Sequence, residues 1–272
     1  MKKLFAFFTV ILTLVSTAIA QPSASLFRQV LQLSGQMETM IDQSPESLDQ
    51  LIMVAKMSNP SITDDVAREK LEKYLKGGFF DDITALALPY YTTLTDDDCR
   101  SLVKALGKKE LQESMKRITT SAAKSQQQLS ATINTSMQQL MSGTTPEAVA
   151  YNEAPASLLK KFNEYSDLIG LESTVVASIE SIQQQLSAML PAGMKEQIEK
   201  SIKGVSDFML SNLRPITFNL MSDSVTEQDL QRYIDIYSTP AGQHMVEGNK
   251  AMASDVLNFS MSMMQKMSEA LK

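Results

Sequence analysis

Apolar side chains recur at three- and four-residue intervals along most of this chain, and this spacing limits what it can fold into. Leu26, Val30, Leu33 and Met37, for example, lie on one face of a helix. Glycine and proline number only 10 and 9 in 272 residues, which leaves little material for hairpin turns. The sequence therefore predicts an all-α protein, built as a multi-helix bundle.

The predicted helices are separated by turn residues such as Asn59-Pro60 and Gly77-Gly78. We expect helices at residues 26–41, 48–57, 63–76, 79–91, 95–106, 108–141, 158–168, 171–190 and 194–209, a short one ending at 221, then 226–237 and 240 to the end. The helix at 108–141 has a thin apolar stripe and a face rich in Ser, Gln and Thr, which predicts cover on one side only.

The chain divides near its middle. Residues 142–157, "SGTTPEAVAYNEAPAS", contain turn residues and two prolines, and we interpret them as a linker between helical halves at 21–141 and 158–272. Residues 24–27 align with 156–159 at an offset of 132, and 94–95 align with 225–226 at an offset of 131. This offset predicts an internal repeat, with two related helical halves.

The first twenty residues, "MKKLFAFFTVILTLVSTAIA", have the order of a secretory signal peptide. Two lysines precede an apolar run from Leu4 to Val15, and small residues end at Ala20. We expect cleavage after Ala20 and a periplasmic or secreted product. No later stretch approaches the roughly 18 apolar residues of a transmembrane helix, so the mature chain is expected to lack an integral span.

Charge and cysteine usage exclude some partners. Without Lys2 and Lys3 the formal net charge changes from −6 to −8, which disfavours nucleic acid and anionic membrane surfaces. Cys99 is the only cysteine, so no intramolecular disulfide can form. In an oxidising compartment a lone thiol is best buried, and we expect this of Cys99.

Residues 225–248, "VTEQDLQRYIDIYSTPAGQHMVEG", predict the junction of two helices. Thr226 and Asp229 have the spacing of a capping box at a helix start. The residues Leu230, Tyr233, Ile234 and Tyr237 then form an apolar face at helical spacing, which we expect to be buried. Pro240 suits the first turn of the next helix, with Ser238 or Thr239 as its cap. Gly242 is expected to let the two helices approach closely.

The same stretch resembles a bacterial exported family called domain of unknown function 2059. The shared features are a Thr-acid-x-Asp-Leu opening, an aromatic helix end, a Ser-Pro-x-Gly turn with Thr239 inserted, and a long last helix. The residues that carry the resemblance are Thr226, Asp229, Leu230, Ile236, Tyr237, Ser238, Pro240, Ala241, Gly242 and Gln243. The segment "LPYYTTLTDDDCRSLVKAL" in the first half resembles a degenerate copy of this stretch that lacks the Tyr-Ser-Thr-Pro-Ala-Gly turn. The resemblance implies an all-helical exported domain and supplies no catalytic residue or cofactor.

Residues typical of catalysis or metal binding are sparse. His244 is the only histidine, with no evident acid to orient it and no His or Cys partner for a metal. Methionines near the C-terminus, including Met261 and Met264, could bind Cu(I), but methionine also fills helix interfaces, which we favour. The sequence contains neither a GxSxG elbow nor a phosphate-binding glycine loop. We expect no enzymatic activity and no cofactor.

The leading interpretation is an exported, non-enzymatic binding or interaction module of the cell envelope. A surface near Met261, Met264 and His244 is the candidate contact region, and its partner would be an envelope protein, a peptide or an apolar ligand. One alternative is a carrier of a small apolar ligand or lipid, which requires a cavity on the order of several hundred Å³. Another is a carboxylate-dependent hydrolase, which requires converging carboxylates of raised pKa. Assembly as a homo-oligomer stays open.

Overall fold

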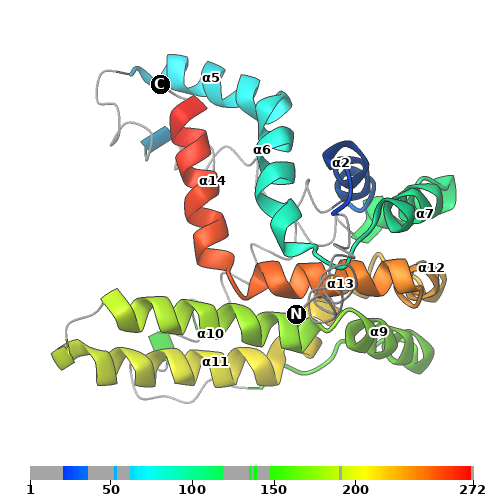
Figure 1. The fold of residues 1–272 in the computed structure, drawn as a ribbon. Helices are drawn as coiled ribbons and strands as arrows, with labels where there is room; N and C mark the ends of the chain where they lie inside the picture. The colour runs from blue at the N-terminus through cyan, green and yellow to red at the C-terminus, as the bar shows by residue number, and fades with distance from the viewer. Residues whose placement is uncertain are drawn as a thin grey trace, which may run out of the picture.

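The structure is a computed structural model that describes residues 21–35, 52–53, 62–118, 135, 138–139, 148–189 and 192–270. Within these ranges every regular element is a helix, which confirms the all-α prediction (Figure 1). No helix of the described part combines the length and apolarity needed to cross a bilayer. The predicted signal peptide and most of the expected helix at 48–57 lie outside the described residues.

From α5 to the helix at 109–118, and again from α9 to α14, the described helices follow one another with short connections. The first half contributes α2 (Ala24–Leu33), α5 (Asp64–Lys76), α6 (Gly78–Ala87), the 3-10 helix η1 (Leu88–Tyr90), α7 (Asp96–Leu106) and a helix over residues 109–118. The second half contributes α9 (Ala156–Leu168), α10 (Leu171–Met189), α11 (Ala192–Met221), α12 (Glu227–Tyr237), α13 (Pro240–Ala253) and α14 (Val256–Ala270).

Helix α13 lies at the centre of the arrangement. It contacts α7 and η1 from the first half, and α10, α12 and α14 from the second. Helices α10 and α11 form an antiparallel pair beneath α13, and α14 turns away from α13 to pack on α6 and α5 (Figure 1). The pairs α2–α7 and α9–α12 lie on the right in Figure 1, at the end opposite the connection between α10 and α11.

The main hydrophobic core is built from both predicted halves. Phe27, Leu71 and Tyr91 from the first half belong to the same buried cluster as Tyr233 and Met245 from the second. The rings of Tyr90 and Phe259, one from each half, lie 6.3 Å apart between centroids at the edge of this core. The two halves are therefore joined by shared apolar packing, which is the main favourable contribution to folding.

Several predicted helix boundaries are wrong. The helix expected at residues 26–41 ends at Leu33, and Gly35 follows in a left-handed conformation with φ 68°. The expected break near Met209 does not occur, and α11 continues through Pro215 to Met221. A proline inside a helix removes one backbone hydrogen bond and costs about 3 kcal/mol. Buried Leu213 and Phe218 flank the proline, and their packing offsets that cost.

The expected single helix from Pro240 to the C-terminal end is also wrong. It breaks at Ser254 and Asp255, and α14 starts at Val256. The Asp255 carboxylate accepts hydrogen bonds from Tyr90 Oη at 2.7 Å and from Asn258 Nδ2 at 2.5 Å. These bonds hold the bend, and α14 consequently packs against α6 rather than extending into solvent.

Candidate functional site

The junction of α12 and α13 forms as the sequence predicts. Thr226 and Asp229 make a complete capping box at the start of α12, and Thr239 Oγ1 accepts from the Gly242 amide at the start of α13. A Cβ at Gly242 would lie 2.3 Å from the Ile236 carbonyl oxygen, so only glycine fits between the two helices. The close contact of α12 and α13 at Gly242 sets the direction in which α13 crosses the core.

The Asp229 carboxylate also joins the two halves. Its side chain is fully buried and accepts a bidentate pair of hydrogen bonds from Arg117, at 3.1 Å from Nε and 2.5 Å from Nη2. Ser114 Oγ donates to it at 2.6 Å, and Arg232 Nη1 lies 3.3 Å away. Burial alone would raise the pKa of Asp229, but the bonds from Arg117, Ser114 and Thr226 outweigh it and hold that pKa well below its usual range. The carboxylate is therefore ionised and structural.

His244 has an acidic partner that the sequence did not predict. Its Nδ1 lies 3.0 Å from Asp98 Oδ2, although the two residues are 146 positions apart. Asp98 also completes the capping box of α7, in which its carboxylate accepts a hydrogen bond from the backbone amide of Thr95. Burial acts to raise the pKa of Asp98, and bonds from Thr95 and His244 lower it overall. The contact between His244 and Asp98 links α13 to α7, so His244 has a structural role.

These contacts recur in corresponding places of the two halves. The capping boxes Thr95–Asp98 and Thr226–Asp229 are 131 residues apart. Gln112 Nε2 donates to the Leu106 carbonyl, and at the same offset Gln243 Nε2 donates to the Tyr237 carbonyl, both at 2.6 Å. Each capping carboxylate then binds a helix of the other half: Asp98 binds α13, and Asp229 binds the helix at 109–118. The internal duplication itself stays a prediction.

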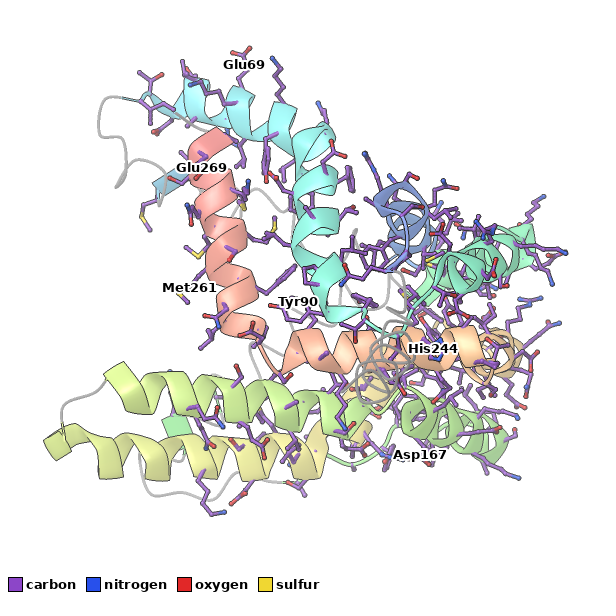
Figure 2. All side chains as sticks on the ribbon, in the orientation of Figure 1. Glu69, Tyr90, Asp167, His244, Met261 and Glu269 are labelled. Carbon is purple, nitrogen blue, oxygen red and sulfur yellow. The ribbon has the colours of Figure 1, made fainter. Side chains whose placement is uncertain are left out.

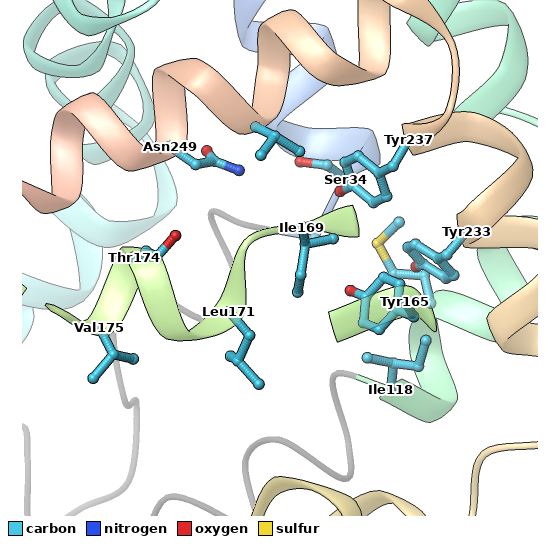
Figure 3. A pocket seen from close by; sticks show the side chains of 13 residues that line it. Ser34, Ile118, Tyr165, Ile169, Leu171, Thr174, Val175, Tyr233, Tyr237 and Asn249 are labelled. Carbon is cyan, nitrogen blue, oxygen red and sulfur yellow. The ribbon is translucent and has the colours of Figure 1, made fainter. Parts of the chain in front are cut away.

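A pocket of about 280 Å³ opens where the two halves meet (Figure 3). Its walls come from the end of α2, the helix at 109–118, and helices α9, α10, α12 and α13. The described residues that line it are mostly apolar or aromatic: Ser34, Gly35, Met115, Ile118, Tyr165, Ile169, Leu171, Thr174, Val175, Tyr233, Tyr237, Val246 and Asn249. This volume is near the lower end for small-molecule sites.

Three tyrosines form one side of the pocket. The ring of Tyr165 lies 5.9 Å from that of Tyr233 and 6.4 Å from that of Tyr237, and the rings of Tyr233 and Tyr237 stack at 6.1 Å. Figure 3 shows them facing Leu171 and Thr174 of α10. Burial raises the pKa of Tyr237 to about 12, and it raises those of Tyr165 and Tyr233 as well. All three phenols are therefore protonated near neutral pH.

The predicted contact residues lie away from this pocket. Met261 and Met264 are 55% and 49% exposed on α14, whereas Met263 and Met267 of the same helix are buried in the core. Figure 2 shows Met261 and His244 on separate helices. None of Met261, Met264 and His244 lines the pocket as described. The structure does not bring these three residues together, and their role as a surface stays a prediction.

Other candidates from the sequence have structural roles. Cys99 is fully buried, as predicted, and burial raises the pKa of its thiol to about 12. Within the described ranges, no three His, Cys, Asp or Glu side chains converge as metal ligands. Arg214 pairs with Asp167 and Glu172, which fastens α11 to the junction of α9 and α10.

Sequence reasoning missed the pocket. Helical spacing predicted that Tyr233 and Tyr237 are buried, which the structure confirms, but nothing marked Tyr165 as their neighbour. Tyrosine content gave no signal, because residues 21–141 and 158–272 contain three tyrosines each.

The C-terminal part of the chain matches a known family model. Residues 211–270 match the family model described as an uncharacterized protein conserved in bacteria (DUF2059), which confirms the resemblance seen in the sequence. The match covers the end of α11 and helices α12, α13 and α14. Comparisons with curated proteins and with solved structures found no match.

Proposed function

We propose that this chain is an exported, non-enzymatic binding protein that holds a small apolar ligand in the pocket beside Tyr165, Tyr233 and Tyr237. The observation that carries the proposal is the pocket itself, a hollow of about 280 Å³ between helices of both halves. Most small-molecule sites combine apolar walls with a few polar groups, and this lining has that composition. Among the earlier hypotheses, the carrier is therefore favoured over a module that binds only at its surface.

The charges support binding rather than hydrolysis. No carboxylate occurs among the described residues that line the pocket. The pKa values of Asp98, Asp229 and Glu172 are all lowered, because hydrogen bonds to their carboxylates outweigh the effect of burial. A general acid needs a raised pKa near the working pH, so these groups have the wrong direction for that role.

Export is proposed from residues 1–20 alone. The two lysines, the apolar run and the small residues before Gln21 support it. The test is to fractionate bacteria that express the chain and to measure the intact mass of the protein in each fraction. A periplasmic form that lacks residues 1–20 is expected, and full-length protein confined to the cytoplasmic fraction would oppose export.

The binding proposal is tested with N-phenyl-1-naphthylamine, an uncharged dye that brightens in apolar surroundings. The dye is excited at wavelengths longer than those that tyrosine and tryptophan absorb, so neither the wild-type chain nor a tryptophan variant adds background. Saturable binding of one dye per chain is expected. The Val175→Trp variant fills the pocket from α10 and should abolish binding, whereas Glu180→Trp on the exposed side of α10 should preserve it. Equal binding by the three proteins would overturn the proposal.

A further inference from the structure

The pocket contains no ionic group among its described lining residues. Its polar side chains are the three tyrosines, Ser34, Thr174 and Asn249. An ion moved from water into such a site loses its hydration without gaining a counter-charge, which costs several kcal/mol. The pocket therefore disfavours both anionic and cationic ligands.

The hydroxyls of the three tyrosines can donate hydrogen bonds to an uncharged ligand. Among the described residues, none is hydrogen-bonded to the hydroxyl of Tyr165, Tyr233 or Tyr237, although Tyr233 and Tyr237 are only 4% and 8% exposed. Asn249 differs, because its Oδ1 already accepts from Tyr91 Oη at 2.5 Å. These hydroxyls are open to solvent, since Ser166 Oγ is the one buried side-chain oxygen or nitrogen that lacks a partner in the described part of the chain. A hydrocarbon in the pocket would cover a hydroxyl without replacing its hydrogen bond to water, whereas a ligand oxygen that accepts from the hydroxyl would replace that bond.

We infer that the ligand is an uncharged molecule with a compact apolar body, the size of one or two rings, and a single acceptor oxygen such as a ketone or ester carbonyl. The body packs between the tyrosine rings and the aliphatic side chains Leu171 and Val175, and the oxygen accepts from the tyrosine hydroxyls. This inference rests on the proposed binding function and adds the chemical class of the ligand.

The test compares three probes of nearly equal shape. The first is 2-acetylnaphthalene, which is neutral and has a carbonyl; the second is 2-ethylnaphthalene, which lacks the oxygen; and the third is 2-naphthoate, which is anionic at neutral pH. Each is titrated calorimetrically into the full mature chain. The ketone is expected to bind about three- to tenfold more tightly than the hydrocarbon, because one hydrogen bond is gained. The carboxylate is expected to bind at least about 100-fold more weakly than the ketone.

Tyrosine variants locate the polar contact. Tyr165→Phe and Tyr233→Phe each keep the ring and remove the hydroxyl, and in at least one of them the preference for the ketone over the hydrocarbon should disappear. Tyr151→Phe, at a tyrosine that is 40% exposed and outside the pocket, is the matched control and should keep that preference.

The outcomes separate this inference from the binding proposal. Failure of all three probes would oppose both. Binding of 2-naphthoate as tight as that of the ketone would leave the binding function standing and overturn the inferred ligand class. Equal affinity for ketone and hydrocarbon in the wild-type chain would overturn the role of the hydroxyls.

Discussion

Replacement of Asp229 by asparagine tests how the two halves are held together. The carboxylate is fully buried and accepts from Ser114, from two nitrogens of Arg117 and from the backbone and hydroxyl of Thr226. Asparagine keeps the shape but has one acceptor oxygen, so its amide group must face either the Arg117 side or the Thr226 side. Breaking a buried ion pair from one side costs about 3–5 kcal/mol. Arg117 is 41% exposed and can be hydrated, so we expect about 3 kcal/mol.

Asp98→Asn is the matched control, because Asp98 occupies the equivalent capping position in α7. Outside the cap, Asp98 contacts the half-buried His244. We expect a loss of less than about 1 kcal/mol there. Urea unfolding followed by far-UV circular dichroism measures both changes. With a slope of about 3 kcal/mol/M, Asp229→Asn should lower the midpoint by about 1 M.

A double-mutant cycle assigns the effect to the pair. Combining Asp229→Asn with Arg117→Gln should cost less than the sum of the single changes, by about 1–3 kcal/mol. Destabilisation by Asp229→Asn no larger than that by Asp98→Asn would refute the reasoning. The same substitution should weaken binding at the pocket, since Ser114 and Arg117 belong to the helix that contributes Met115 and Ile118 to its wall.

Three further predictions concern pH, packing and the thiol. The folded-state pKa of Asp229 lies below the ordinary value of 3.8. Its stabilising contribution is therefore complete above about pH 4 and is lost as the pH falls toward the folded-state pKa. The thermal midpoint should fall steeply below pH 4 in the wild-type chain and less steeply in Asp229→Asn. Gly242→Ala should lower the free energy of unfolding in urea by about 2–3 kcal/mol, because its Cβ would lie 2.3 Å from a backbone oxygen. Gly77→Ala, whose Cβ would have its nearest neighbour at 3.6 Å, should be close to neutral. Similar losses of stability at the two sites would contradict the close packing of α12 and α13 at Gly242. Cys99 should resist a thiol reagent at pH 8 in the native protein and react at once in denaturant, and fast native labelling would show that the thiol is accessible.

Local features could be predicted from the sequence because their causes lie within one or two helical turns. The capping box at Thr226 and the proline start of α13 depend on residues no more than three positions apart, and both form. The continuation of α11 through Pro215 could not be predicted this way. Its cause is burial of Leu213 and Phe218 against other helices, and local propensity does not report tertiary packing.

The candidate site depends on contacts that no local pattern encodes. Helical spacing shows which face of α12 is buried but not that Asp229 meets Arg117, 112 positions away, or that His244 meets Asp98. The pocket is harder still, because a cavity is space that packed side chains leave unfilled and has no residue pattern of its own. The sequence therefore predicted the burial of Tyr233 and Tyr237 without the hollow beside them.

Calorimetric titration of 2-acetylnaphthalene into the wild-type chain, Val175→Trp and Glu180→Trp tests the central claim most directly. We expect one equivalent to bind to the wild-type chain and to Glu180→Trp with equal affinity, and no measurable binding to a folded Val175→Trp. Undiminished binding to Val175→Trp, with its unfolding midpoint unchanged, would show that the pocket between the halves is not the binding site.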